Sequence, residues 1–125
     1  TRLGVRRARA GCRRPPAAPD RGSQVTCKAI ILLSRRDDMT HEEFLSWWFD
    51  EHAPLAAQLP NVRRIVFNAT HEHDDIDGVS ELWFDSRSDF DAAYATEIGK
   101  QVAADSMAHV RSRVRVFVDE RQITE

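Results

Sequence analysis

The sequence lacks the residue patterns that build several well-known kinds of site. Its two cysteines, Cys12 and Cys27, do not have the paired spacing of a disulfide framework or a thiolate metal centre. A glycine-rich phosphate loop, a nucleophile elbow and a dinucleotide fingerprint are all missing. These absences argue against a tightly bound nucleotide or flavin, and we expect no cofactor.

Long apolar runs are also missing. No stretch approaches the roughly 20 apolar residues that a membrane-spanning helix needs, and no apolar segment of the kind found in secretory signals is present. We therefore expect a cytoplasmic protein with no membrane association. The chain has 125 residues and 42% hydrophobic content, which is enough for one domain with a core.

Charge is distributed unevenly along the chain. Residues 1–24 hold seven arginines and one acid, a net charge of +6, whereas residues 25–125 carry −8. An acidic surface disfavours contact with phosphates, so we expect no nucleic-acid partner for the folded domain, 25–125.

The Arg-rich tail, residues 1–24, contains prolines and almost no large apolar side chain, and it is expected to be disordered. A tail of this kind could be an organellar transit peptide, a nucleic-acid arm, or upstream sequence translated from a misplaced start. The missing amphipathic periodicity favours the last interpretation, in which the tail is not part of the native protein.

The sharpest local signal is a helix start in residues 39–55. Thr40 is placed to be the N-cap and Glu43 to complete a capping box, while Met39 and Phe44 occupy the hydrophobic-staple positions. At helical spacing the aromatic residues that follow, together with His52, fall on one wide arc.

The end of this helix is predicted from Pro54, which disfavours helical geometry at the residue before it. We expect the helix to end or bend just after His52, and a short second helical turn to cover residues 54–59. A histidine in the last turn feels the negative end of the helix dipole, which favours its protonated form. His52 is therefore a candidate proton donor or acceptor.

The remaining pattern predicts strands at residues 25–34, 62–70, 79–85 and 111–119, and a helix from about residue 87 to 104 that is broken near Gly99. The order β-α-β-β-α-β predicts an α+β fold, a ferredoxin-like sandwich with both helices on one face of the sheet.

Both faces of the predicted sheet are apolar. In the first strand Ile31 and Leu33 lie on one face and Ile30 and Leu32 on the other. Because the helices cover only one face, the other needs a second cover, and another copy of the chain would provide one. We predict a homodimer whose sheets face each other across a shared apolar interior.

Several residues of the domain form a pattern that spans these elements. They are Arg35, Thr40, Glu43, Phe44, Trp48, His52, Pro54, Leu55, Asn68 and the run Glu81-Leu82-Trp83-Phe84. On these residues the region 25–125 resembles the EthD-like family of dimeric α/β-barrel proteins. The resemblance also matches Asp105 to an aspartate late in the second helical region, whereas Met107-Ala108-His109 stands where the family has an aromatic residue.

The resemblance implies a small dimer with a cleft, linked to bacterial breakdown of ethers, aromatics or lactones, sometimes beside an oxidising system. Related dimeric barrels act as cofactor-independent isomerases, cyclases, monooxygenases or dehalogenating enzymes. The resemblance therefore implies a class of proteins and leaves the reaction open.

The candidate catalytic residues are His52 and Asp105. From spacing alone, His52 could be a core histidine that bonds a carbonyl group. The family pattern favours a second interpretation, in which the imidazole moves a proton at a carbon alpha to a carbonyl or at a lactone oxygen. Asp105 is then the carboxylate that would orient the imidazole.

Asn68 and Glu81 are candidate substrate-binding residues, because strand alternation directs both toward the shared interior. A buried glutamate needs a partner or a raised pKa, and a glutamate at a strand edge in water is the alternative. Phe44, Trp48 and Trp83 could line a cleft for a flat apolar substrate, although aromatic residues of this kind more often belong to a core or an interface.

The loop 71–77 contains His71 and His73, a His-x-His pair that could hold a metal ion. Charge-rich loops are more often simply solvated, and we expect no metal. The leading hypothesis is a small catabolic enzyme that acts by acid–base chemistry on an apolar carbonyl, lactone, ether or aromatic compound. A cofactor-independent oxidoreductase and a non-catalytic carrier or accessory to an oxygenase system are the alternatives.

Overall fold

The computed structural model describes residues 26–71 and 75–125. The Arg-rich tail therefore lies outside the described residues, as does the His73 half of the His-x-His pair. The elements follow in the order β2 (Cys27–Arg35), α1 (His41–Trp47), η1 (Trp48–His52), α2 (Ala53–Ala56), β3 (Arg64–Ala69), β4 (Gly78–Phe84), α3 (Arg87–Ala95), α4 (Glu97–His109) and β5 (Val110–Val118).

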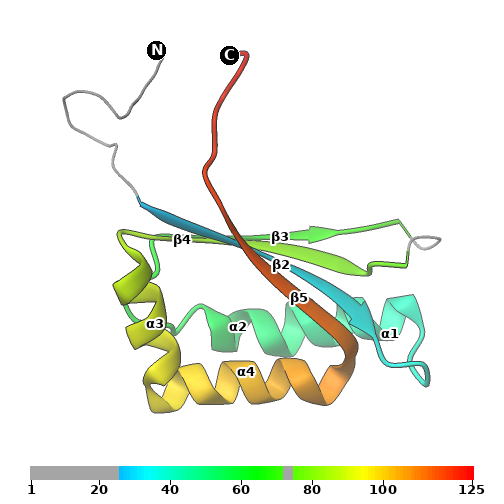
Figure 1. The fold of residues 1–125 in the computed structure, drawn as a ribbon. Helices are drawn as coiled ribbons and strands as arrows, with labels where there is room; N and C mark the ends of the chain where they lie inside the picture. Colours follow the sequence, from blue (N-terminus) through cyan, green and yellow to red (C-terminus); the bar gives the residue numbers. More distant parts are fainter. Residues whose placement is uncertain (1–25, 72–74) are drawn as a thin grey trace.

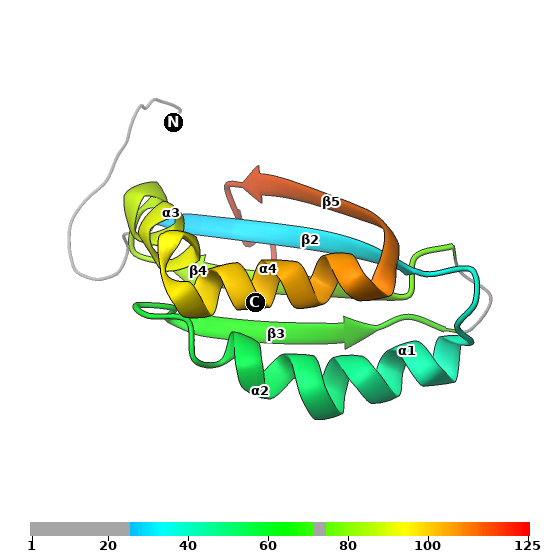
Figure 2. The ribbon, with the colours of Figure 1, turned by 90° about the horizontal axis from the view of Figure 1, so that it is seen from below.

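The strands form a four-stranded sheet in the order β3-β4-β2-β5, and all neighbours are antiparallel. All helices of the described residues lie on one side of this sheet, and none of them covers its other side (Figure 1). Seen from the helical side, the α1–η1–α2 segment and α4 run side by side (Figure 2). The predicted α+β ferredoxin-like architecture is confirmed. No helix in the described ranges is long and apolar enough to cross a membrane.

The helix start at Thr40 is as predicted. The Thr40 hydroxyl accepts a hydrogen bond from the Glu43 backbone N–H at 3.0 Å, and the Glu43 carboxylate accepts one from the Thr40 N–H at 2.8 Å. This capping box satisfies two of the N–H groups that a helix leaves unpaired at its start. It fixes where the helix that carries His52 begins.

The boundary after His52 falls where it was predicted, since η1 ends at His52 and the short helix α2 follows it, but the two are joined without a break in the helical backbone. The chain stays helical past His52 because residues 48–52 form a π-helical turn, in which the Ala53 N–H donates to the Trp48 carbonyl. Pro54 then lies in the first turn of α2. A proline within a regular helix would clash with the carbonyl four residues earlier, and the wider π turn relieves that clash. Turns of this kind are frequent at functional sites.

The break between the second pair of helices falls at Thr96, not near Gly99 as predicted. Thr96 is extended and caps α4 by accepting a hydrogen bond from the Gly99 N–H at 3.1 Å. Gly99 is needed for another reason: a Cβ there would lie 2.5 Å from the Cα of Tyr94. The glycine permits the close approach of the start of α4 to the end of α3.

The two faces of the sheet differ in what covers them. The face under the helices is buried and contributes Ala29, Ile31, Leu33, Leu82 and Phe84 to the core. The open face is formed by Lys28, Ile30, Leu32, Val66, Asn68, Val79, Glu81, Trp83, Val114, Val116 and Val118. On this face Val114 is 51% exposed and Val116 is 41% exposed, so it presents apolar side chains to solvent as the alternation predicts.

Candidate functional site

The predicted catalytic pair is brought together by the packing of η1 against α4. His52 Nδ1 lies 2.8 Å from Asp105 Oδ2, although the two residues are 53 positions apart in the sequence. A carboxylate only accepts hydrogen bonds, so His52 Nδ1 carries the proton in this contact. In the neutral ring Nε2 is then left with its lone pair, which is the form that can act as a base.

The Asp105 carboxylate is also held from a second direction. Trp47 Nε1 donates to both of its oxygens, at 3.3 and 3.2 Å. His109 stacks on the Trp47 ring with 4.2 Å between centroids and 15° between planes, and its Nδ1 lies 2.8 Å from the Asp105 carbonyl oxygen. His109 therefore supplies a flat ring in the stretch where the family has an aromatic residue.

The other nitrogen of His52 faces Ser106. The Ser106 hydroxyl lies 3.3 Å from His52 Nε2, and both side chains are buried. Asp105, His52 and Ser106 thus form a continuous hydrogen-bonded chain. Such a chain can move a proton between Nε2 and a group beside the serine.

Burial controls the charge of His52. The side chain is only 5% exposed, and this desolvation lowers the pKa of the imidazole below its ordinary value of 6.5. Asp105 opposes the shift by stabilising the imidazolium, whereas the positive charges of His109 and Arg113 add to it. The net direction is downward, so His52 is neutral near pH 7 and is available as a proton acceptor. This corrects the expectation that the helix dipole favours the protonated form.

A small cavity adjoins His52 between the sheet and the helices. Its volume is about 20 Å³, which is room for roughly one water molecule. The buried part of its wall includes Trp48, His52, Ser80, Leu82, Val102 and Ser106. The cavity lies within one subunit, on the helical side of the sheet, so it is not the interior between two facing sheets that the sequence pattern suggested.

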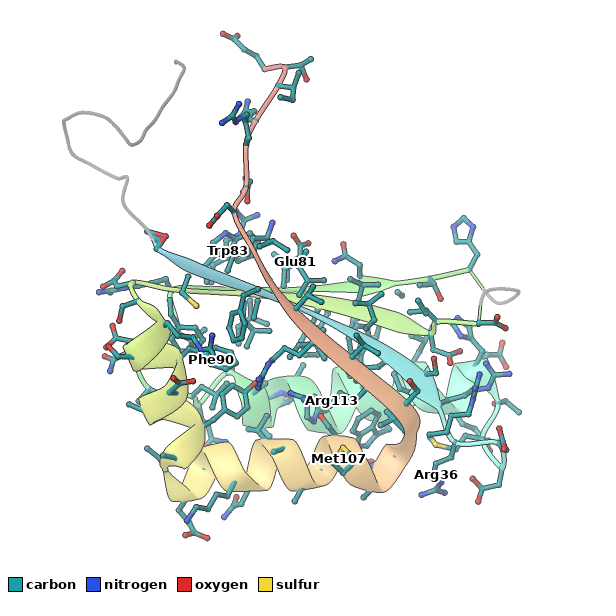
Figure 3. All side chains as sticks on the ribbon, in the orientation of Figure 1. Arg36, Glu81, Trp83, Phe90, Met107 and Arg113 are labelled. Carbon is teal, nitrogen blue, oxygen red and sulfur yellow. The ribbon has the colours of Figure 1, made fainter. Side chains whose placement is uncertain are left out.

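The half-buried part of the cavity wall includes two polar side chains, Tyr94 from α3 and Arg113 from β5. Arg113 extends from β5 toward the helices, into the layer that contains the cavity (Figure 3). Burial raises the pKa of the Tyr94 hydroxyl, while the positive charge of Arg113 acts in the opposite direction. The cavity wall therefore has a buried floor, which includes Trp48, His52 and Ser106, and a half-buried rim, which includes Tyr94 and the cation Arg113.

Trp48 belongs to the buried part of the cavity wall. Its indole stacks on Phe67 of β3 with 4.2 Å between centroids and 9° between planes. Its Nε1 is buried and has no hydrogen-bond partner among the described residues. Phe44 does not line the cavity; it is fully buried beneath α1, with its centroid 5.6 Å from that of Trp48.

The other predicted binding residues lie on the opposite side of the sheet. Glu81 and Trp83 are seen above the sheet in Figure 3, whereas Arg113 is below it. Asn68 Nδ2 donates to Glu81 Oε2 at 3.0 Å, and Lys28 Nζ lies 3.0 Å from Glu81 Oε1. Within this chain Asn68, Glu81 and Trp83 therefore do not share a cleft with His52, because strand alternation turns these side chains away from the helices, onto the face that was predicted to meet a second copy.

Glu81 has the partners that a half-buried glutamate needs, and its pKa is not raised. The hydrogen bond from Asn68 and the contact with Lys28 lower the pKa of its carboxyl group, although burial opposes them. A carboxyl group with a lowered pKa stays ionised near neutral pH. Glu81 is thus a fixed charge on the open face.

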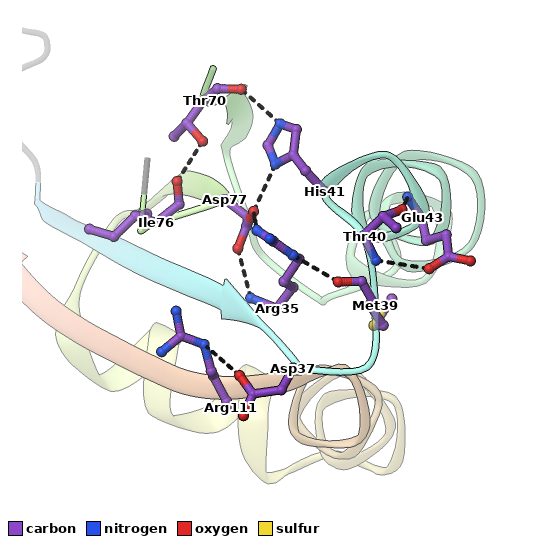
Figure 4. Close-up of polar contacts among 10 residues, drawn as sticks. All are labelled: Arg35, Asp37, Met39, Thr40, His41, Glu43, Thr70, Ile76, Asp77 and Arg111. Carbon is purple, nitrogen blue, oxygen red and sulfur yellow. Dashed lines mark hydrogen bonds and ion pairs between the residues drawn. The ribbon is translucent and has the colours of Figure 1, made fainter. Parts of the chain in front are cut away.

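A second buried polar cluster ties the end of β2 to the start of α1 (Figure 4). Asp77 is fully buried and accepts hydrogen bonds from the Arg35 N–H at 2.8 Å and from Arg35 Nη1 at 2.6 Å. His41 Nδ1 lies 2.7 Å from the same carboxylate, and its Nε2 lies 3.0 Å from the Thr70 carbonyl oxygen. Asp77, which belongs to the charge-rich loop 71–77, is therefore bound by Arg35 and His41.

Within residues 26–71 and 75–125, no group of three or more histidine, cysteine, aspartate or glutamate side chains could hold a metal ion. The His-x-His pair itself falls partly on residue 73, outside the described residues. The polar groups that the cavity wall presents are the imidazole of His52, the hydroxyls of Ser80, Tyr94 and Ser106, and the guanidinium of Arg113.

A family model of the EthD domain matches residues 36–110. The chain belongs to the EthD family. The match covers α1, η1, α4 and the strands between them, and so includes His52 and Asp105. A search of curated proteins found no match.

Solved structures share the fold of this EthD domain. An EthD family protein from Bacillus halodurans C-125 has a TM-score of 0.68 at 20% identity, covering 78% of this chain and 100% of that one. A dimeric protein with a ferredoxin-like fold from Bacteroides fragilis has a TM-score of 0.61 at 21% identity, covering 75% of this chain and 95% of that one. SnoaB, a cofactor-independent oxygenase from Streptomyces nogalater, has a TM-score of 0.60 at 18% identity, covering 77% and 93%.

Sequence reasoning missed Ser106, Tyr94, Phe67 and Arg113 in this EthD domain. One signal was available: the alternation of 111–118 puts Arg113 and the valines on opposite faces. Had the valine face been assigned to the open side, Arg113 would have been directed toward the helices. Ser106 and Tyr94 have no such signal, because their positions depend on the break at Thr96.

Proposed function

We propose that the chain is a small enzyme that uses His52 as a general base and acid on an apolar carbonyl, lactone, ether or aromatic compound. The observation that carries the proposal is the hydrogen-bonded series Asp105–His52–Ser106 beside a cavity with an apolar floor. In the proposed reaction, His52 Nε2 takes a proton from a carbon alpha to a carbonyl, and returns it to another atom of the substrate.

Asp105 supports this cycle in two ways. Its contact with Nδ1 keeps the lone pair on Nε2, and its charge stabilises the imidazolium once the proton has been taken. Trp47 holds the carboxylate in position. A positioned acid–base group of this kind contributes about 10²- to 10⁴-fold to a rate.

The cavity must enlarge to admit a substrate, since it holds roughly one water molecule as it stands. The half-buried side chains of its wall, Phe67, Tyr94 and Arg113, are those able to move without opening the core. Catalytic loops and rims commonly rearrange in this way on the microsecond to millisecond timescale.

The experiment that tests the proposal is a turnover screen of lactones, 1,3-dicarbonyl compounds and aryl ketones, read by proton exchange with D₂O and by product formation. The wild-type protein is compared with His52→Gln and with the surface variant His71→Gln, a matched loss of an imidazole. Loss of turnover in His52→Gln alone, with an unchanged circular dichroism spectrum, supports the proposal. Full turnover in His52→Gln contradicts it.

A cofactor-independent oxidoreductase is the second candidate function. It is favoured by the stacked floor of Trp48 and Phe67, which suits a flat aromatic substrate, and by the shared fold with the oxygenase SnoaB. Substrate-dependent oxygen uptake without added flavin or metal would distinguish it from pure acid–base chemistry. Saturable quenching of tryptophan fluorescence with neither turnover nor oxygen uptake would instead indicate a carrier or an accessory to an oxygenase system.

We propose further that the working form is a homodimer joined through the open face. The exposed Val114 and Val116 form an apolar edge there, and a structure with the same fold is described as dimeric. Val116→Glu should shift the chain to a monomer in sedimentation equilibrium, because it would bury a charge in the interface. Met107→Glu, at a 62% exposed position on α4, is the matched control and should leave the dimer intact.

A further inference from the structure

Arg113 occupies an unusual position for an arginine. It lies on the face of β5 that is turned toward the helices, opposite Leu33 of β2, and it lines the same cavity as His52. Long basic side chains on an edge strand usually extend into water or pair with an acid. Arg113 instead lies beside the apolar floor formed by Trp48 and Phe67.

Within the described part of the chain, no carboxylate pairs with Arg113. Two nearby cations do have carboxylate partners: Arg111 lies 3.5 Å from Asp37, and Lys28 lies 3.0 Å from Glu81. Arg115 of the same strand has none among the described residues, but it is exposed to solvent and lies over the rings of Phe90 and Phe117, whereas Arg113 is half-buried. The polar group that acts on Arg113 is the Tyr94 hydroxyl. Burial lowers the pKa of the guanidinium, and only the tyrosine offsets this effect. An arginine nevertheless remains charged near neutral pH.

Burial of a cation costs desolvation free energy, and without a carboxylate partner in the chain this cost is offset only when another anion binds to the cation. We propose that Arg113, together with the Tyr94 hydroxyl, binds a carboxylate group of the substrate. This assignment rests on the proposed function of the cavity and makes it more specific, because it names the substrate class as small apolar carboxylic acids. The guanidinium presents two parallel N–H donors that match the two oxygens of a carboxylate.

The arrangement also gives the carboxylate a role in orienting the substrate. Arg113 and Tyr94 lie at the half-buried rim, whereas His52 and Ser106 lie at the buried floor. A substrate held at the rim by its carboxylate directs its apolar body toward Trp48 and its reacting carbon toward His52 Nε2. A neutral analogue of the same shape would lose the charged anchor.

The test measures binding and requires no turnover. Isothermal titration calorimetry near pH 7 with the full chain compares benzoate with benzamide, and phenylacetate with phenylacetamide. The acids should bind about tenfold or more tightly than their amides, because a hydrogen bond to a charged group contributes more than a neutral one. Equal binding of acids and amides, or no binding of either acid, would overturn the proposal.

Variants then locate the anchor. Arg113→Met should weaken binding of the acids by about tenfold or more and leave binding of the amides unchanged. Arg113→Lys keeps the positive charge but loses the two parallel N–H donors of the guanidinium, so it should weaken binding of the acids by less. Arg115→Met is the matched control: its guanidinium lies over the rings of Phe90 and Phe117, outside the cavity wall, and it should bind the acids like the wild type. Unchanged binding in a folded Arg113→Met variant, or an equal loss in Arg115→Met, contradicts the assignment.

His52→Gln separates the two proposals. If benzoate still binds to this variant while Arg113→Met has lost it, the carboxylate site stands whether or not His52 is catalytic. If turnover depends on His52 but acids and amides bind equally, the acid–base function stands and the carboxylate site does not.

Discussion

Trp47 Nε1 donates to both oxygens of the Asp105 carboxylate, at 3.3 and 3.2 Å, and the same carboxylate lies 2.8 Å from His52 Nδ1. The carboxylate is therefore held from two sides before any substrate arrives. A geometry fixed in this way favours one tautomer of His52, with the lone pair on Nε2. Trp47 is a positioning residue in this arrangement, since it holds the Asp105 carboxylate and also packs against the His52 ring, with 4.9 Å between centroids.

The first prediction concerns Asp105→Asn. Asp105 raises the pKa of His52 against the stronger effect of burial, so removal of its charge should lower that pKa further. We expect turnover to fall on the order of 100-fold, while the fold is retained. An NMR titration of the His52 ring, with His71→Gln used to assign the surface histidine, measures the pKa shift directly. A His52 pKa that rises in this variant would contradict the arrangement.

The second prediction concerns stability against pH. Because the folded state lowers the pKa of His52 below 6.5, the unfolded chain binds more protons than the folded chain as the pH falls through this value. Stability contributed by the neutral ring is thus fully present above this value and is lost as the pH falls below it. Urea unfolding at about pH 7.5 and about pH 5 should show the loss in the wild type and a smaller one in His52→Gln. His71→Gln should keep the slope of the wild type.

The third prediction concerns the buried cluster of Asp77. Burial by itself would raise the pKa of this carboxyl group, but hydrogen bonds from the Arg35 N–H and from His41, with the Arg35 guanidinium, lower it. Asp77→Asn leaves Arg35 and His41 without their shared charge, and should reduce the free energy of unfolding by about 2–4 kcal/mol. Asp85→Asn removes an exposed carboxylate paired with Arg63 and should cost less than about 1 kcal/mol. Equal losses of unfolding free energy in Asp77→Asn and Asp85→Asn would show that the buried Asp77 cluster stabilises the fold no more than an exposed ion pair does.

The fold was predictable because its signals are local. The capping box at Thr40 needs only residues 40 and 43, and the alternation of the strands defines two faces whatever the rest of the chain does. The contact between His52 and Asp105 was predictable from the family pattern, which named the aspartate as the group that orients the imidazole.

The remainder depends on contacts between distant segments. The π turn at 48–52 has no local signature apart from Pro54, and strand alternation alone does not say which face of the sheet the helices cover. Asn68 and Glu81 were predicted on the face away from the helices, where the structure has them, but His52 was expected to share their cleft although the sheet separates it from them. The missing choice of face explains why Arg113 was overlooked.

The last prediction concerns the floor of the cavity. Gly78 of β4 lies directly beneath Trp48, and a Cβ at this position would be 2.6 Å from two atoms of the indole ring. Gly78→Ala must therefore displace an indole that is fully buried and stacked on Phe67. Overpacking of this kind should lower the free energy of unfolding by about 1–3 kcal/mol.

A second substitution tests whether the ring is the cause. Trp48→Phe shortens the side chain and should relieve the contact, so the double variant Gly78→Ala/Trp48→Phe should lose less stability than the sum of the two single variants. Urea unfolding of all four proteins gives the coupling energy, which should exceed about 0.5 kcal/mol for residues in contact. Additive losses of stability would show that Gly78 is required for the backbone conformation of β4 and not for the packing of the Trp48 indole. If the coupling is found, the glycine is one of the residues that set the depth of the cavity below His52.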